Sequence, residues 1–153
     1  MVEAALLEGG WLDALRRLGA ATAVGAIIGL DRELHGKPLG LRTLTVVSIA
    51  SCALTVAAVR YDLALGDESH ETVGRAIQGL MAGIGFLGGG VILHTREDRV
   101  HGLTTAALVW LTAALGVVCG LAAWPIVAIA LLLALVMLVI GGPLERLLAR
   151  HPP

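Results

Sequence analysis

Residues 102–144 read GLTTAALVWLTAALGVVCGLAAWPIVAIALLLALVMLVIGGPL and contain no charged side chain. A helix that crosses the hydrocarbon core of a membrane needs about 20 apolar residues. At 43 residues, this stretch is long enough for two crossings. Gly120, Trp124 and Pro125 interrupt it near its middle and predict the point at which the chain folds back. The stretch therefore predicts an integral membrane protein.

The composition of the whole chain agrees with a membrane protein. Hydrophobic residues make up 57% of the 153 residues, charged residues make up 15%, and the mean hydropathy is +0.86. The formal net charge of -1 argues against a nucleic-acid partner, which would need a concentrated basic face. Cys52 and Cys119 lie inside apolar runs and predict neither a disulfide framework nor a metal pair.

Apolar runs between the charged residues predict an all-α, polytopic membrane helix bundle that forms a single domain over residues 1–153. The expected transmembrane helices are Trp11–Leu30, Leu41–Val59, Gly74–Leu93, Gly102–Leu121 and Pro125–Gly141. The uncharged part of the first, Leu18–Leu30, is only about 20 Å long against a hydrocarbon core of about 30 Å. This helix spans the membrane only if Arg16 and Arg17 extend to the headgroups.

Basic residues divide unequally between the two sides of this bundle. The N-terminal side holds Arg16, Arg17, Arg60 and Arg75, whereas the other holds Arg32, Lys37, Arg42, Arg96, Arg99, Arg146 and Arg150. Since cytoplasmic loops carry the excess of basic residues, we expect an outward N-terminus and a cytoplasmic C-terminus. Trp11, Tyr61 and Trp124 then fall at the outer interface, as an aromatic belt requires.

Glycines recur within the predicted helices. Residues 83–88 spell the dinucleotide-binding pattern, but they lie inside an apolar run and not at a strand-to-helix turn. Spacing by four instead predicts close helix packing, both within the third helix and elsewhere. The pairs are Gly25/Gly29, Gly79/Gly83, Gly85/Gly89 and Gly116/Gly120, and in the third helix we assign packing to Gly83, Gly85, Gly88 and Gly89. Three successive glycines, Gly88 to Gly90, predict a helix break. The fifth helix, including Ala134, is apolar all round and is expected to face lipid.

A short sequence pattern occurs twice. Gly40-Leu41-Arg42-Thr43 opens the second predicted helix, and Gly102-Leu103-Thr104-Thr105 opens the fourth, sixty-two residues later. Two crossings separate the copies, so both have the same orientation. The pattern predicts a tandem repeat of helix pairs one-two and three-four, with the fifth helix as an addition.

Together, these motifs resemble those of the MgtC/SapB family of membrane proteins. The similar segments, in order, are Gly29-Leu30-Asp31-Arg32-Glu33, Gly40-Leu41-Arg42-Thr43, the glycine-rich run at residues 83–90, and Gly102-Leu103-Thr104-Thr105-Ala106-Ala107 followed by Trp110. The resemblance covers about residues 24–145. The chain stops just after Glu145, so we expect the transmembrane domain without the soluble C-terminal domain of the family's namesake.

The resemblance implies a bacterial inner-membrane protein linked to magnesium homeostasis and, in intracellular pathogens, to survival inside the host. Two functions stay open. The chain is either a magnesium transporter or a non-catalytic regulator that binds another membrane complex, such as the ATP synthase, through its helices. No resident cofactor is expected, although Mg²⁺ would be a substrate or effector. The bilayer is the expected partner, and a homo-oligomer is compatible with the glycine pairs.

Polar signature residues gather at the expected cytoplasmic end of the bundle. They are Asp31, Glu33, Arg42, Thr43, His94, Thr104 and Thr105. The starts of two helices there, together with the positive charge of Arg42, favour an anion or a carboxylate partner. The sharpest hypothesis is that Asp31 holds Arg42 and Thr104 completes a polar site. The alternative is that Arg42 pairs with Asp31 or Glu33 and merely pins the first two helices.

Metal binding and catalysis have weaker support. The acidic outer loop offers Asp62, Asp67, Glu68, His70 and Glu71, either as a weak divalent-cation site or as a solvated loop. The cytoplasmic loop offers His94, Glu97, Asp98 and His101 as ligands for zinc or another transition metal, but Arg96 and Arg99 oppose a cation there. No enzyme is expected, because Ser48, Ser51 and Cys52 share a helix with no histidine or carboxylate.

Overall fold

The structure, a computed structural model, describes residues 10–66, 71–93 and 102–148, and these residues form five α-helices with no strand among them. The helices are α2 (Trp11–Leu34), α3 (Leu41–Leu65), α4 (Glu71–Leu93), α5 (Leu103–Gly120) and α6 (Trp124–Leu148). Each corresponds to one predicted helix, so the predicted all-α polytopic bundle is confirmed. The break predicted at Gly88 to Gly90 is wrong, because α4 continues to Leu93. A helix satisfies its own backbone groups, and the hydrocarbon core offers them no other partner.

Four helices are long and apolar enough to cross a membrane. Their candidate spans are Leu41–Leu65, Glu71–Ile92, Leu103–Gly120 and Trp124–Gly141. The chain is thus a multi-pass membrane protein. α2 has the length for a crossing but carries charged residues in both its first two turns and its last turn, so its crossing stays a prediction.

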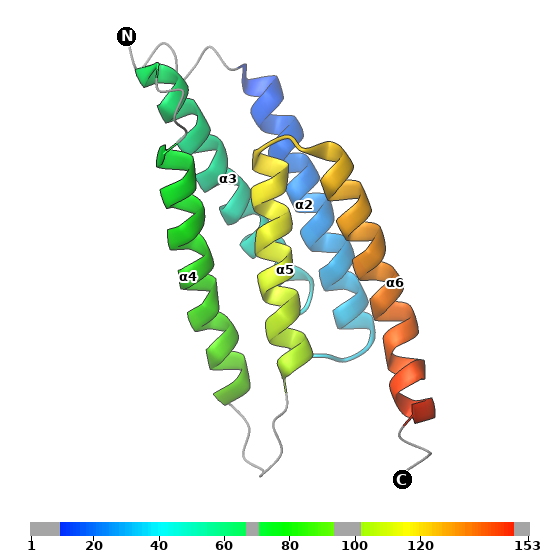
Figure 1. Ribbon diagram of the computed structural model, residues 1–153. Helices are drawn as coiled ribbons and strands as arrows, with labels where there is room; N and C mark the ends of the chain where they lie inside the picture. Colours follow the sequence, from blue (N-terminus) through cyan, green and yellow to red (C-terminus); the bar gives the residue numbers. More distant parts are fainter. Residues whose placement is uncertain (1–9, 67–70, 94–101, 149–153) are drawn as a thin grey trace.

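The helices run side by side along one long axis, with the start of α2 and the end of α6 at opposite ends (Figure 1). α3 and α5 pack against each other, α2 packs on both, and α4 packs on both from another side. α6 packs chiefly on α5. Exchanging α2 with α4 and α3 with α5 leaves the same helix pairs in contact, although α2 and α3 contact each other more extensively than α4 and α5 do. The predicted tandem repeat of two helix pairs requires this pattern.

Glycines bring α2 and α5 into backbone contact with α3. A Cβ added at Gly25 would lie 2.6 Å from Thr45 Cα, and one at Gly29 would lie 2.7 Å from Leu41 Cα. On α5, a Cβ at Gly120 would lie 2.6 Å from Thr55 Cβ, and one at Gly116 would overlap the backbone around Ser48. Two of the four predicted glycine pairs therefore serve helix packing within the chain.

The glycines of α4 behave differently. A Cβ added at Gly83, Gly85 or Gly89 would meet open space, so these three glycines form no close packing contact with the other described residues. Gly88 alone among the four assigned glycines faces a neighbour, Ala106, at an ordinary 3.6 Å from an added Cβ. The rotation of α4 about its own axis explains this difference. The face of α4 that bears Val73 and Gly88 lies against the bundle, and most of its small residues lie on the outside. Packing of these glycines between chains stays a prediction.

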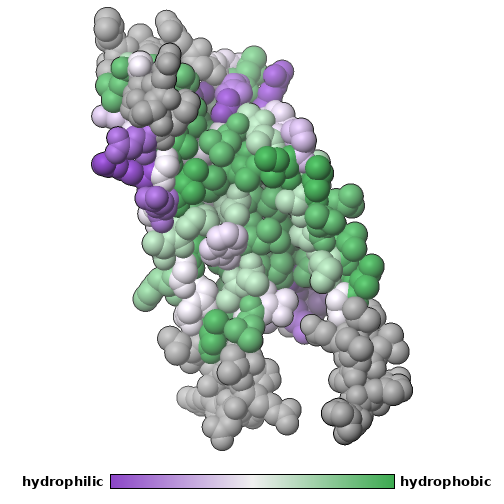
Figure 2. All heavy atoms as spheres, viewed as in Figure 1, coloured by the Kyte–Doolittle hydropathy of each residue, from purple (hydrophilic) through white to green (hydrophobic). Residues whose placement is uncertain are grey.

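Large aliphatic side chains cover the outward face of α6. Ile129, Leu132, Leu133, Met137 and Ile140 are exposed, which suits contact with lipid. Figure 2 shows a hydrophobic surface over the middle of the bundle and hydrophilic residues toward its ends. Ala134 is an exception: it is buried, and the expectation that it faces lipid is wrong. It lies seven residues after the buried Val127 and so shares the inward face of α6.

Candidate functional site

A buried arginine anchors the polar end of the core. Arg32 lies in the last turn of α2 and is only 5% exposed. Its Nη2 donates to the hydroxyl of Thr105 in the first turn of α5 and to the carbonyl of Pro38 at 3.3 Å. One guanidinium therefore joins α2, α5 and the turn that leads into α3.

The sequence placed Arg32 in the motif at residues 29–33 and among the basic residues on one side of the membrane, but predicted no site role for it. The signal that would have found it is helical spacing. Ala21, Val24, Gly25, Ile28 and Gly29 form the buried face of α2, and Arg32 continues that face by one more step of three or four residues. A charge placed on a buried helical face needs an internal partner, here Thr105.

The predicted pair of Asp31 and Arg42 does not form. Asp31 Oδ1 instead lies 3.4 Å from Nδ1 of His35, one turn further along. Arg42 is exposed and makes no ion pair within the described residues. Thr104 is exposed as well, so the expected site of Asp31, Arg42 and Thr104 is not assembled. The helix phase decides this, since Thr105 and not Thr104 lies on the inward face of α5.

Glu33 caps the start of α3. Its Oε2 accepts the backbone N–H of Leu41 at 2.9 Å, while the preceding Gly40 provides no side-chain cap. A carboxylate at this position also interacts favourably with the positive end of the helix dipole. Glu33 therefore forms a hydrogen bond to the start of α3, and the alternative ion pair with Arg42 is not present among the described residues.

A shallow, open hollow lies beside this cap. We call it the turn hollow, and it is lined by Glu33, Gly36, Lys37, Gly40, Arg42 and Thr43. Gly36 and Leu39 both adopt left-handed backbone conformations, each with φ of 60°, which lets the chain reverse between α2 and α3 within six residues. The hollow thus gathers three of the predicted polar residues, Glu33, Arg42 and Thr43, whereas Thr105 belongs to the buried Arg32 contact.

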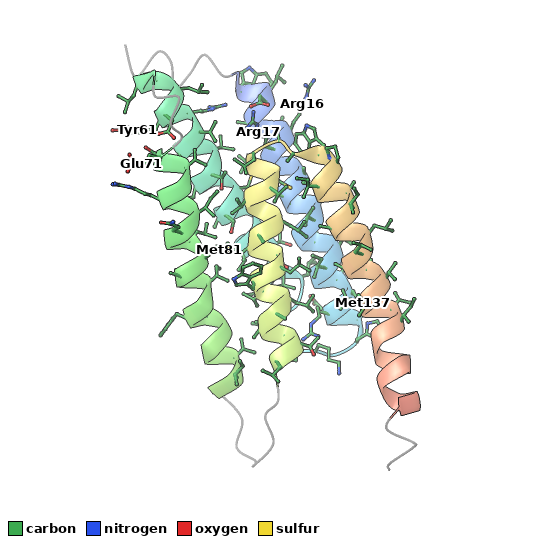
Figure 3. All side chains as sticks on the ribbon, viewed as in Figure 1. Arg16, Arg17, Tyr61, Glu71, Met81 and Met137 are labelled. Atoms are coloured by element: carbon green, nitrogen blue, oxygen red, sulfur yellow. The ribbon has the colours of Figure 1, made fainter. Side chains whose placement is uncertain are left out.

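The opposite end of the bundle has its own polar contacts. Arg17 Nη1 donates to the carbonyl of Gly120 at 2.7 Å, and Arg17 Nε lies 2.8 Å from Asp13 Oδ2. This places a cation at the C-terminal end of α5, where the helix dipole favours it. Arg16, Arg17, Tyr61 and Glu71 all lie at this end (Figure 3).

Asp62 near the end of α3 is 1% exposed, and its Oδ2 accepts the backbone N–H of Val73 in the first turn of α4 at 3.2 Å. Its other oxygen, Oδ1, is buried without a hydrogen-bond partner in the described part of the chain. Asp62 therefore acts as a buried cap for α4.

The described residues hold no group of three or more histidine, cysteine, aspartate or glutamate side chains that could bind a metal ion. Of the outer-loop candidates, Glu71 pairs with Arg75, and Asp62 bonds to α4. The other candidates lie outside the described residues: Asp67, Glu68 and His70 in one loop, and His94, Glu97, Asp98 and His101 in the other.

Hydroxyl groups inside the core bond to their own helices. Ser51 donates to the carbonyl of Val47, Thr55 to that of Ser51, and Thr112 to that of Leu108, each at 2.7–2.8 Å and four residues back. The hydroxyls of Ser48 and Thr45 are buried without a partner among the described residues. The interior between α2, α3 and α5 is thus polar but closely packed.

The model of the MgtC family matches residues 18–147, which include α3, α4 and α5 and most of α2 and α6. The chain belongs to the MgtC family. The matched region includes Arg32, Thr105 and the whole turn hollow.

Named relatives of this MgtC-family chain come from several bacteria. Protein SrpB of Synechococcus elongatus is 42% identical over 78% of this chain and 69% of its own length. Protein SapB of Bacillus subtilis is 40% identical over 71% of this chain and 47% of its own length. Protein MgtC of Brucella abortus is 39% identical over 67% of this chain and 40% of its own length. The chain therefore spans about half or less of the length of SapB and MgtC. No solved structure matches it.

Proposed function

We propose that this chain acts in magnesium homeostasis as a non-catalytic regulator that binds another membrane protein through its helices. The role in magnesium homeostasis is what the resemblance to the family implies. The choice of a regulator over a carrier rests on one observation, namely the closed core between α2, α3 and α5. A dehydrated divalent cation needs carboxylate or carbonyl oxygens along its path, and the described part of this core offers chiefly hydroxyls.

Close packing strengthens this choice. At Gly25, Gly29, Gly116 and Gly120 the helix backbones meet so tightly that even one added carbon would collide with a neighbour. Ser51, Thr55 and Thr112 direct their hydroxyl protons to carbonyls of their own helices. An ion path along α3 would require these contacts to separate.

The outward faces of α4 and α6 differ in a way that suits a protein partner on α4. α6 presents large aliphatic side chains, which suit lipid. α4 presents small residues, among them Gly79, Ala82, Gly83 and Gly85, beside the exposed Phe86 and Leu87, and another helix backbone could approach closely at the small residues. The exposed Gln78 on the same helix could hydrogen-bond to such a partner.

Flux and co-purification experiments test the proposal together. Purified chain in liposomes loaded with a magnesium-sensitive dye should give no more Mg²⁺ entry than protein-free liposomes. Tagged chain extracted from its native membrane in mild detergent should retain a second membrane protein. Saturable Mg²⁺ entry that requires the chain would overturn the regulator and establish the transporter.

A matched pair of variants locates the partner. Gly85→Leu adds bulk to the open face of α4, and Ala128→Leu adds similar bulk to the exposed face of α6. We expect neither variant to melt below the wild type, while only Gly85→Leu loses the co-purified protein. Equal retention of that protein by both variants would exclude α4 as the contact.

A further inference from the structure

The turn hollow carries more positive than negative charge. Lys37 and Arg42 line it with two cationic side chains, and Glu33 lines it with one carboxylate. Neither cation forms an ion pair within the described residues. Glu33 is already engaged, since its Oε2 accepts the N–H of Leu41. The two cations therefore converge on a hollow in which their charge is only partly balanced.

Uncharged donors lie in the same hollow. Arg42 and Thr43 occupy the first turn of α3, where backbone N–H groups have no partner inside the helix. The structure records no other partner for these two N–H groups or for the Thr43 hydroxyl within the described residues. Two cations, a hydroxyl and free N–H groups are the donors that proteins use for phosphate oxygens.

The hollow is held in shape by the turn around it. The N–H of Gly36 donates to the carbonyl of Glu33 at 3.1 Å, and that of Lys37 donates to the carbonyl of Arg32 at 3.0 Å. The buried guanidinium of Arg32 holds the carbonyl of Pro38 from the other side. A ligand therefore meets a backbone that is already in place, which reduces the entropy lost on binding.

The hollow also borders the apolar surface. Val46, one helical turn after Arg42, is 64% exposed, and Leu34, just before the turn, is 75% exposed. Arg42 is thus positioned where a basic side chain meets both the headgroups and the hydrocarbon region.

We propose that the turn hollow binds a phosphate group, carried either by the headgroup of an anionic phospholipid or by a soluble phosphate compound. Lys37 and Arg42 supply the positive charge, and Thr43 donates a hydrogen bond. The negative charge of Glu33 repels the phosphate group and so lowers its affinity for the hollow. Binding of a phosphate group here is independent of whether the chain regulates or carries magnesium.

Two probes identify the source of the phosphate. Native mass spectrometry of the chain released from mixed phosphatidylcholine and phosphatidylglycerol nanodiscs counts retained phosphatidylglycerol. Calorimetry in pure phosphatidylcholine nanodiscs measures binding of inorganic phosphate. Retention of phosphatidylglycerol with no phosphate binding identifies a lipid headgroup, whereas binding of inorganic phosphate identifies a soluble ligand. If the wild-type chain binds neither, the proposal is wrong.

Variants tie the binding to the hollow. Lys37→Gln and Arg42→Gln should each weaken binding about fivefold, the effect of one basic side chain near an anionic surface, and the double variant should lose about 25-fold. Glu33→Gln keeps an acceptor for the Leu41 N–H but removes the opposing charge, so it should bind more tightly. Arg16→Gln removes an exposed arginine at the other end of the bundle and should leave binding unchanged. Unchanged binding by the double variant, or an equal loss in Arg16→Gln, would overturn the proposal.

Discussion

Arg32 at the end of α2 donates a hydrogen bond to Thr105 at the start of α5, across 73 residues of sequence and with both side chains buried. This contact holds α2 and α5 together at the end where the turn hollow opens. The same guanidinium holds the carbonyl of Pro38 in the turn. The position of the turn therefore depends on a contact made by the core.

Arg32→Ala should destabilise the chain, because it removes two hydrogen bonds and leaves the Thr105 hydroxyl buried without its partner. Hydrogen bonds to charged groups contribute about 1.5–3 kcal/mol each. Arg42→Ala removes an exposed arginine and should cost no more than about 0.5 kcal/mol. Thermal unfolding in one detergent, followed by circular dichroism, compares the two. Equal melting temperatures would show that Arg32 does not support the fold.

The two adjacent threonines provide an independent check of the same contact. Thr105→Val keeps the shape of the side chain but removes the oxygen that accepts from Arg32. Thr104→Val makes the same chemical change at an exposed position. Only Thr105→Val should lower the melting temperature.

Glycine substitutions should have opposite effects on different helices. Gly25→Ala and Gly116→Ala put a carbon into the backbones that meet α3, and overpacking of this kind costs about 1–3 kcal/mol. In Gly85→Ala and Gly89→Ala the added carbon lies in open space beside α4. Alanine is more favourable than glycine inside an α-helix by up to about 1 kcal/mol. In detergent, both α4 variants should therefore have higher melting temperatures than the wild type, and Gly25→Ala and Gly116→Ala should have lower ones. A loss of stability on α4 equal to that on α2 and α5 would contradict this packing.

Hydropathy, together with the glycine and proline residues that end helices, predicted the architecture of this chain well. Runs of apolar residues as long as that at residues 102–144 have few structural solutions other than transmembrane helices, and Gly120 and Pro125 mark the turn between α5 and α6. The spacing of Gly25/Gly29 and Gly116/Gly120 correctly indicated close packing. The identical spacing on α4 marks no contact among the described residues, because spacing places residues on one face without showing which face turns inward.

The candidate site was harder to predict for the same reason. Signature residues cluster at one end of the bundle as expected, but the rotation of each helix decides which of two neighbours is buried. Thr105 is buried and Thr104 is exposed, while Arg32 rather than Arg42 enters the core. The buried face of α2 extends through Gly29 to Arg32 and was visible in the sequence, whereas the partner of Arg32 on α5 was not.

Arg17 and Arg16 should differ in the same way at the opposite end. Arg17 donates to the carbonyl of Gly120 and joins α2 to the end of α5, whereas the neighbouring Arg16 is exposed. Arg17→Gln should therefore cost about 1–2 kcal/mol through the lost charged hydrogen bond and helix-end interaction. Arg16→Gln should be close to neutral in the same unfolding assay. The reverse order would mean that the contact with Gly120 adds nothing to stability.

Asp62 should stabilise the fold mainly by accepting a hydrogen bond and less through its negative charge. Asp62→Ala removes the cap of the Val73 N–H and should cost about 1–2 kcal/mol. Asp62→Asn retains an oxygen for this bond and places a neutral group where one carboxylate oxygen is buried without a partner, so it should be less damaging. Melting temperatures at one pH measure both. If Asp62→Asn is as damaging as Asp62→Ala, the charge itself supports α4.

The orientation in the membrane is a prediction from the unequal division of basic residues, and two exposed positions can test it. Lys37→Cys lies in the turn between α2 and α3, and Leu65→Cys lies at the far end of α3. The native Cys52 and Cys119 are fully buried and should react slowly. We expect a membrane-impermeant maleimide added outside intact cells to label Leu65→Cys and to spare Lys37→Cys until the cells are opened. The opposite pattern would invert the bundle. The turn hollow would then face the outer side, and a soluble phosphate compound from the cytoplasm could no longer be its ligand.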